Sequence, residues 1–204
     1  MTWQENGVAD HEFTNITLLF QGWRKVFDLT IRSPSGATFK REIVDRGSAA
    51  AVLPYDTGRR TVMMVRQFRA PVLYDGGPEY LVEAIAGLLD EGDGPESCAR
   101  REAMEEAGVH IEALEPVGAA WSAPGATTER IHLYLAPYTS DSRVAAGGGL
   151  AHENEEIEVL ELGFDAVDGM LARLEFVDLK TMVLVQALKL RHPSLFDGTG
   201  DSGG

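Results

Sequence analysis

Aromatic and β-branched apolar residues, set among polar ones, characterise segments in the first quarter of the chain, and they predict β-strands. Residues 23–31, WRKVFDLTI, are rich in the aromatic and β-branched residues that favour strands. Residues 33–36, Ser-Pro-Ser-Gly, form a turn, because proline presets φ and glycine accepts unusual φ values. Residues 37–47 read as the returning strand, so residues 13–46 are expected to form a β-rich unit. Residues 1–12 are expected to be a loose arm.

A lone hairpin has little stability of its own. Two strands without a partner surface are marginal in water. The N-terminal unit is therefore expected to pack on the rest of the chain or on a second copy of it.

The remaining sequence alternates between strand-like and helix-like segments. The predicted strands are 49–56, 60–69, 79–87, 117–121, 130–138 and 157–164. The predicted helices are 95–108, 165–175 and 178–190. A flexible loop is expected to begin at the AAGGG tract of residues 145–149 and to run through the acidic residues 152–156. This mixture predicts a layered α/β or α+β domain.

The domain division follows from these segments. We expect residues 1–46 to form the arm and the β unit, and residues 47–196 to form the main domain. The last residues, DGTGDSGG at 197–204, have the composition of a disordered tail.

The helix at 95–108 has clear boundary signals. Pro95 suits the first turn, Glu96 complements the positive end of the helix dipole, and Gly108 suits the position just past the C-terminus.

Composition narrows the class of protein. Apolar residues make up 44% of the 204 residues, which indicates a globular fold rather than disorder. The formal net charge of −14 disfavours a nucleic-acid duplex as a partner, because like charges repel. If the substrate is a nucleotide, local arginines or bound cations must make the electrostatic potential positive at the binding site.

The sequence also indicates the compartment. Cys98 is the single cysteine, so a disulfide within one chain is impossible, as is typical of a reducing cytosol. Residues 1–13 lack the basic and apolar regions of a signal peptide, and apolar runs stay far below the length of about 20 residues that a membrane-spanning helix needs. We expect a soluble protein of the cytoplasm without a membrane partner.

Three carboxylates concentrate on the predicted helix. Glu105 and Glu106 lie three and four residues after Glu102 and so share its face. These carboxylates repel one another, and they lie near the negative end of the helix dipole, which disfavours anions. A hard divalent cation such as Mg²⁺ would relieve both effects. The alternative is a solvated acidic face that Arg101, at i,i+4 to Glu105, neutralises in part.

The segment around these carboxylates favours the metal-site interpretation. Residues 87–109, GLLDEGDGPESCARREAMEEAGV, resemble the Nudix box in both residue types and spacing. The positions in register are Gly87, Arg101, Glu102, Ala103, Glu105, Glu106, Gly108 and Val109. Asp93 stands where the family has its first glutamate, a position that is not usually a main metal ligand.

The resemblance covers roughly residues 20–195. The segments REIVDRG, VRQFR, EAIAG and WSAPGATTE, followed by an acidic loop, resemble the ADP-ribose and ADP-sugar pyrophosphatase branch of the family. The AGGG tract and the IEVLEL segment resemble bacterial GDP-mannose hydrolases in particular. The fold that this implies is a Nudix α/β/α sandwich with a mixed sheet. The small N-terminal antiparallel β unit is implied to be exchanged across a homodimer.

The resemblance implies a metal site and catalytic groups. The backbone carbonyl of Ala86 and the side chains of Glu102, Glu106 and Glu155 match metal ligands. Glu155 also matches the loop glutamate that orients or activates water, although the acidic run 153–156 offers several candidates for that position. Glu105, close to the ligands, is counted with Glu106 and Glu155 as catalytic.

A second set of residues is matched to the substrate. Arg69 matches a phosphate-binding arginine, and Arg41 and Glu42 match positions that reach a neighbouring subunit's site. Trp23 is either a stacking partner for a base or, as is more usual for such a tryptophan, a core or interface residue. The substrate contacts assigned by motif are Arg41, Glu42, Arg69, Gly87, Glu129 and Lys180, with Trp23 added on chemical grounds.

The implied activity is metal-dependent hydrolysis of a nucleoside-diphosphate sugar. Mg²⁺ is the expected cofactor, with Mn²⁺ able to substitute, and GDP-mannose is the expected substrate, cleaved to GMP and mannose 1-phosphate. The alternatives are an ADP-ribose or ADP-sugar pyrophosphatase and a Nudix-fold binding module without catalysis. Retention of all three box glutamates argues against the binding module.

Overall fold

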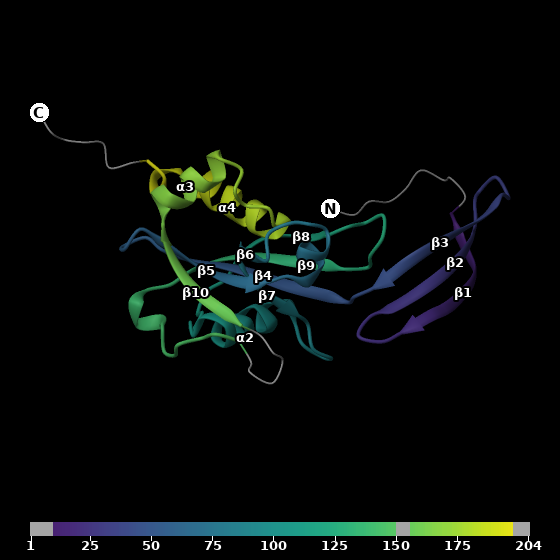
Figure 1. The fold of residues 1–204 in the computed structure, drawn as a ribbon, viewed down its shortest axis with the longest axis horizontal. Helices are drawn as coiled ribbons and strands as arrows, with labels where there is room; N and C mark the ends of the chain where they lie inside the picture. The colour runs from purple at the N-terminus through teal and green to yellow at the C-terminus, as the bar shows by residue number, and fades with distance from the viewer. Residues whose placement is uncertain (1–9, 150–155, 198–204) are drawn as a thin grey trace, which may run out of the picture. The chain divides into compact units, whose positions relative to one another are not determined.

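The computed structural model describes residues 10–149 and 156–197, which fold into two compact units. The first unit contains residues 10–47 and 123–129. The second contains residues 48–122, 130–149 and 156–197. Figure 1 shows a small sheet in the first unit and a larger sheet with helices in the second.

The first unit is a three-stranded antiparallel sheet in the order β1-β2-β3. Its strands are β1 (Glu12–Gln21), β2 (Lys25–Arg32) and β3 (Thr38–Asp45). The predicted hairpin is thus present as β2 and β3. Its first strand begins at Lys25 rather than Trp23, because Trp23 and Arg24 lie in the β1–β2 turn, where the Gly22 amide donates to the Arg24 carbonyl at 3.0 Å.

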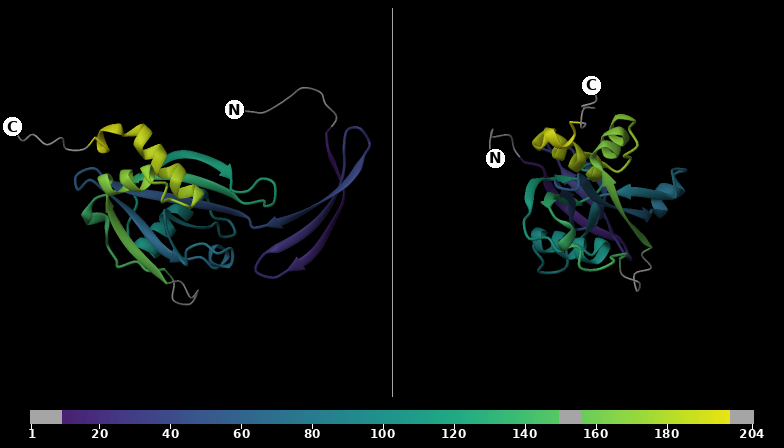
Figure 2. Two further views of the ribbon diagram at one scale, coloured as in Figure 1. Left: turned by 45° about the horizontal axis from the view of Figure 1, so that its top comes forward. Right: turned by 90° about the vertical axis from the view of Figure 1, so that its left-hand side faces the viewer.

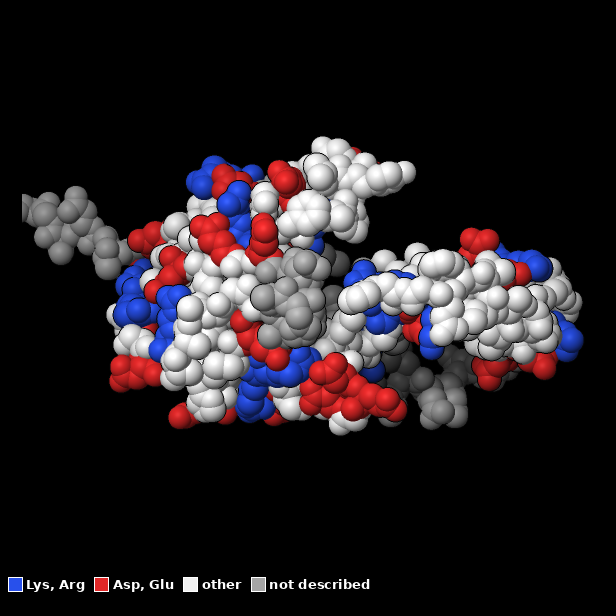
Figure 3. All heavy atoms as spheres, turned by 60° about the horizontal axis from the view of Figure 1, so that its bottom comes forward, with Lys and Arg blue, Asp and Glu red and all other residues white. Residues whose placement is uncertain are grey.

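Strand β1 was not predicted as a separate element. Every one of its residues is exposed, so its sequence lacks the alternation that burial on one face imposes. Five large apolar side chains on it are between 45% and 61% exposed: Phe13, Ile16, Leu18, Leu19 and Phe20. We call these five residues the β1 apolar patch. Figure 3 shows a largely uncharged surface over this sheet.

A segment distant in sequence also belongs to the first unit. The Val44 amide donates to the Ala126 carbonyl at 2.9 Å, and the Thr128 amide donates to the Val44 carbonyl at 3.1 Å. These bonds attach the loop 123–129, which connects two strands of the second unit, to the end of β3.

Within its described residues, the second unit contains a seven-stranded mixed sheet. Its strands are β4 (Ser48–Asp56), β5 (Thr61–Phe68), β6 (Tyr80–Glu83), β7 (Ile85–Leu88), β8 (Glu115–Trp121), β9 (Arg130–Pro137) and β10 (Ile157–Gly163). The main order is β10-β5-β4-β9-β8, with β6 added to β5 and β7 added to β4. The β4–β9 pair is parallel, and the other pairs are antiparallel.

Helices cover both faces of this sheet, as Figure 2 shows. They are α2 (Pro95–Ala107) on one face and α3 (Phe164–Ala172) with α4 (Leu179–Arg191) on the other. Strand β4 is buried almost throughout, and its residues divide between the two layers: Ala50 and Val52 pack in the α2 cluster, whereas Ala51 and Leu53 pack in the α3–α4 cluster. The predicted α/β/α sandwich with a mixed sheet is confirmed.

The apolar run 79–87, predicted as one strand, forms two. Strand β6 pairs with β5, and β7 pairs with β4, so the chain passes from one neighbour to the other at Ala84. A short helix that was not predicted, α1 (Ala70–Tyr74), connects β5 to β6. The change of partner places the Ala86–Gly87 backbone next to the helix formed by residues 95–107.

The boundaries of α2 agree with the sequence signals. Pro95 occupies the first turn, and Gly108 follows the helix with a φ of 67°, which favours glycine. The Gly108 amide donates to the Met104 carbonyl, and the Val109 amide donates to the Ala103 carbonyl, both at 3.0 Å. These two bonds form the expected glycine C-terminal cap. Within residues 10–149 and 156–197, we find no helix long and apolar enough to cross a membrane.

Candidate active site

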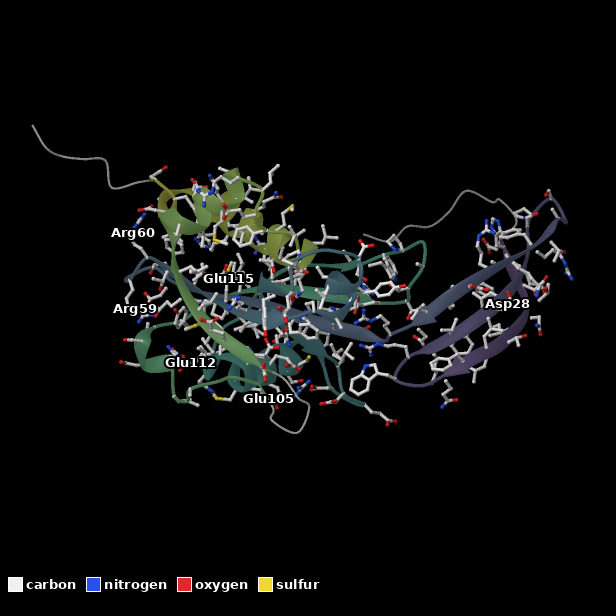
Figure 4. All side chains as sticks on the ribbon, in the orientation of Figure 1. Asp28, Arg59, Arg60, Glu105, Glu112 and Glu115 are labelled. Carbon is white, nitrogen blue, oxygen red and sulfur yellow. The ribbon has the colours of Figure 1, made fainter. Side chains whose placement is uncertain are left out.

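The box carboxylates lie on α2, where it faces the sheet. Glu102 and Glu106 are only 8% and 3% exposed, whereas Glu105 is half-buried. Figure 4 labels Glu105 on this helix. Because Glu102 and Glu106 are four residues apart, they occupy one face, and that face is turned inward rather than to solvent. A solvated acidic face is therefore wrong for these two carboxylates.

Both carboxylates lie against the backbone at the start of the box. The Ala86 amide donates to Oε2 of Glu106 at 3.3 Å. A Cβ atom added to Gly87 would lie 1.8 Å from Oε1 and 2.1 Å from Cδ of Glu102. A side chain at position 87 would therefore displace the Glu102 carboxylate, which fills the space that a Cβ would take.

Arg101 connects the carboxylates to the preceding loop. Its Nη1 donates to Glu102 Oε1 at 2.7 Å and to Glu105 Oε2 at 3.0 Å, while its Nη2 donates to the Leu88 carbonyl at 3.0 Å. Burial alone would lower the pKa of Arg101, but Glu102 and its other anionic neighbours outweigh burial and raise the pKa. The expected partial neutralisation of Glu105 is therefore present, and it includes Glu102.

These groups suit a hard divalent cation. Two buried carboxylates and the neighbouring backbone of Ala86 offer oxygen donors, which magnesium and similar ions prefer. Holding two carboxylates in a buried place is costly unless positive charge or hydrogen bonds compensate them. Among residues 10–149 and 156–197, three or more acidic, histidine or cysteine side chains do not gather around a common metal position. The further ligand expected from the sequence, Glu155, lies outside the described residues.

The glycine tract at 145–149 holds the end of α2. The Gly148 amide donates to the Glu106 carbonyl at 2.8 Å, and the Gly149 amide donates to the Glu105 carbonyl at 3.1 Å. These bonds satisfy helix-terminal carbonyls that lack partners within the helix. Gly147, Gly148 and Gly149 have φ values of 74°, 111° and 75°, which explains the residue type. The bonds show where the tract is attached, and the flexibility expected of the loop that begins at 145 stays a prediction.

The predicted phosphate-binding Arg69 and the predicted substrate contact Lys180 meet on a residue that sequence reasoning missed. Arg69 donates from Nε and Nη2 to the two carboxylate oxygens of Glu83, each at 2.8 Å. Lys180 at the start of α4 donates from Nζ to Oε2 of Glu83 at 2.5 Å. Glu83 is 2% exposed. The available signal was a single charge within the apolar run 80–86.

The charges of this cluster are mutually stabilised. Burial raises the pKa of Glu83, but hydrogen bonds and charge from Arg69 and Lys180 outweigh it and lower the pKa below its ordinary value. Burial likewise lowers the pKa of Arg69, and Glu83, with smaller contributions from Glu106 and Asp178, raises it above its ordinary value.

The other predicted substrate residues lie in the first unit. Trp23 is 83% exposed, with the Arg24 guanidinium 5.7 Å from its ring centre, so it is not a core residue of this chain. Arg41 and Glu42 are exposed neighbours on β3. Glu129 is mostly buried and lies 3.3 Å from the Arg46 guanidinium. The structure therefore brings together one set of predicted residues in the second unit: Arg69, Ala86, Gly87, Glu102, Glu105, Glu106 and Lys180.

Cys98 is packed on the inward side of α2. Burial, followed by the charge of Glu102, raises the pKa of its thiol to about 11. The thiol is therefore neutral at physiological pH, which is unsuited to a nucleophile.

Known proteins resemble both the sequence and the fold. The NUDIX domain family matches residues 45–182. The chain is 44% identical over 166 residues to the GDP-mannose pyrophosphatase of Cronobacter sakazakii, covering 81% of this chain and 85% of that one. It is 40% identical over 188 residues to the GDP-mannose pyrophosphatase of Escherichia coli K12, covering 91% and 92%. The crystal structure of an ADP compounds hydrolase matches 93% of this chain and 98% of that one, with a TM-score of 0.72 and 15% identity, and so shares the fold. On the residues matched and the lengths covered, this chain belongs to the Nudix family.

Proposed function

We propose that this Nudix hydrolase cleaves the pyrophosphate bond of GDP-mannose to give GMP and mannose 1-phosphate. The observation that carries the proposal is the 40–44% identity, over most of both chains, to proteins named GDP-mannose pyrophosphatase. The site agrees with this chemistry, because buried carboxylates lie near two cations, Arg69 and Lys180, that suit a diphosphate.

The residues that would hold the metal are Glu102, Glu106 and the carbonyl of Ala86, with Glu155 as the further expected ligand. We propose Mg²⁺ as the cofactor, with Mn²⁺ as a substitute. Such a cation neutralises phosphate charge and lowers the pKa of bound water.

The protein groups have separate parts in the reaction. Arg69 and Lys180 bind phosphate oxygens, and Gly87 keeps space for the Glu102 carboxylate. Glu155, with Glu105 and Glu106, orients the attacking water and accepts its proton. The water oxygen joins one phosphorus, and the bond from that phosphorus to the bridging oxygen breaks, which gives two monophosphates.

We also propose a homodimer in which the first unit completes a partner's site. The β1 apolar patch supports this, because such a run of exposed apolar side chains on an edge strand favours association. Trp23, Arg41, Glu42 and Glu129 would then contact the substrate from the partner chain. The expected cytoplasmic location stays a prediction, and the buried free thiol of Cys98 agrees with it.

A substrate panel tests the proposed activity. GDP-mannose, ADP-ribose and ADP-glucose are incubated with the protein and magnesium, and the released monophosphates are quantified. We expect the highest kcat/KM with GDP-mannose and complete loss of turnover with a chelator. A higher kcat/KM with ADP-ribose would contradict GDP-mannose as the preferred substrate, but the protein would still be a nucleoside-diphosphate-sugar pyrophosphatase. Absence of turnover with all three would favour the non-catalytic module.

A further inference from the structure

Glu83 is a buried carboxylate that has no assigned part in the chemistry above. It ends β6 and is 2% exposed, yet it accepts two hydrogen bonds from Arg69 and one from Lys180. An isolated carboxylate at such a depth would be strongly disfavoured. Glu83 is therefore retained at this depth by two cations, and both cations are held by it.

Further hydrogen bonds and an ion pair hold the cluster of Glu83, Arg69 and Lys180 in place. The Ala84 amide donates to Thr181 Oγ1 at 2.7 Å, which ties β6 to the first turn of α4. Asp178 caps that turn by accepting from the Thr181 amide at 3.0 Å, and it lies 3.0 Å from the Lys180 ammonium. Lys180 is thus held between Asp178 and Glu83, with only 11% of its side chain exposed.

Glu83 also lies on the same side of the sheet as the box carboxylates. Ala84 and Ala86 pack with the α3–α4 cluster, whereas Ile85 packs with the α2 cluster. By this alternation, Glu83 and Gly87 face α2. The Ala86 amide, three residues after Glu83 in the chain, donates to Glu106 Oε2 at 3.3 Å, so the proposed metal ligands begin close to Glu83.

One nitrogen of the Arg69 guanidinium is not used by Glu83. The bonds to Glu83 use Nε and Nη2 of Arg69, and within the described residues its Nη1 makes no hydrogen bond. The Arg69 side chain is 36% exposed, so the guanidinium is within reach of a ligand. A guanidinium whose other edge is fixed loses little freedom when it binds a phosphate oxygen.

We propose that Glu83 is a positioning residue: its two carboxylate oxygens fix Arg69 and Lys180 in advance as a paired receptor for the diphosphate of the substrate. This inference rests on the proposed function for the identity of the ligand. It adds that the two cations act as one unit, held by a carboxylate that does not itself touch the substrate.

Substitution of Glu83 by glutamine tests the inference. The amide keeps the shape but removes the negative charge and replaces one accepting oxygen with an NH₂ group, so the two cations lose the counter-charge that they share. We expect kcat/KM for GDP-mannose to fall about tenfold or more, mainly through a higher KM, which is the factor that losing a charge-assisted hydrogen bond produces. Asp168→Asn is the control, because it removes the ion pair between Asp168 of α3 and Lys189 of α4, and so takes a carboxylate partner from another lysine of the helix that carries Lys180. It should leave KM unchanged.

A double-mutant cycle separates positioning from a merely structural part. If Glu83 acts through Lys180 as well as Arg69, then Glu83→Gln should lower kcat/KM by a smaller factor in a Lys180→Met background than in the wild type, because the effects of coupled residues are not additive. This double variant also removes a buried cation together with its counter-charge, so it stays informative if Glu83→Gln folds poorly. Circular dichroism reports the folded fraction of each variant. Full additivity, or an unchanged KM in folded Glu83→Gln, would overturn the inference.

A binding measurement separates failure of this inference from failure of the proposed function. Calorimetric titration with inorganic pyrophosphate and magnesium measures diphosphate affinity without a base or sugar. Weaker pyrophosphate binding by Glu83→Gln supports positioning, even if the wild-type protein does not hydrolyse GDP-mannose. Wild-type hydrolysis of GDP-mannose together with unchanged pyrophosphate affinity in Glu83→Gln would contradict positioning while leaving the proposed function intact.

Discussion

Gly87→Ala offers a perturbation whose size can be worked out from the structure. The added Cβ would lie 1.8 Å from Glu102 Oε1, whereas ordinary contact begins at 3.4 Å. The carboxylate must therefore retreat by about 1.6 Å, and misplacement of a catalytic group by about 1 Å can cost about 100-fold in rate. We expect kcat/KM to fall about 100-fold or more, which corresponds to about 2.7 kcal/mol of transition-state stabilisation.

The same substitution should affect folding little. The atoms in conflict are the far end of a flexible side chain, and alanine in a strand regains about 0.5–1 kcal/mol relative to glycine. We expect a change of about 1 kcal/mol or less, or a shift in Tm of about 2–4 °C. Steady-state kinetics with saturating magnesium and thermal unfolding followed by circular dichroism measure the two effects. Gly118→Ala is the control, because a Cβ there meets nothing within 4 Å. If folded Gly87→Ala keeps kcat/KM within about twofold of wild type, the reasoning about Glu102 is refuted.

Three further predictions concern stability, reactivity and assembly. Gly147→Ala should lower the free energy of unfolding by about 1–3 kcal/mol more than Gly36→Ala, because both residues have positive φ but only the Gly147 Cβ would meet the α2 backbone, at 2.4 Å; equal urea midpoints would contradict this. Because the pKa of Cys98 is raised to about 11, its thiol is neutral at pH 8 and should react with iodoacetamide far more slowly in the folded protein than in urea. Equal rates would be inconsistent with that burial. For the dimer, mixing Arg41→Ala chains with Glu106→Gln chains should restore part of the activity, since one site of the mixed dimer keeps both wild-type residues; sedimentation as an active monomer would exclude the arrangement.

The sequence predicted those parts of the fold in which local signals and burial agree. Strand β4 reads as an apolar run because both of its faces are covered, and α2 has Pro95 and Gly108 at its ends. Strand β1 was missed because every one of its residues is exposed, so burial leaves no periodic pattern in its sequence. The division of residues 79–87 into β6 and β7 was missed because it depends on which strand each half pairs with. The local sequence pattern does not indicate which strands pair.

The candidate site shows the same division. Glu102, Glu105 and Glu106 were found because helical spacing and a known motif coincide. Glu83 was passed over because its partners, Arg69 and Lys180, are 14 and 97 residues away in sequence. The bonds from the glycines of the tract 145–149 to the end of α2 were not predicted, because composition alone does not reveal them.

The most direct test of the account is product analysis for the wild-type protein and for Glu106→Gln. GDP-mannose and magnesium are added to each, and the products are separated by anion-exchange chromatography. We predict equimolar GMP and mannose 1-phosphate from the wild type. Glu106→Gln should fold normally but turn over at least about 100-fold more slowly, because a buried carboxylate of the metal site is neutralised. Release of GDP and free mannose, or wild-type turnover by folded Glu106→Gln, would contradict the account.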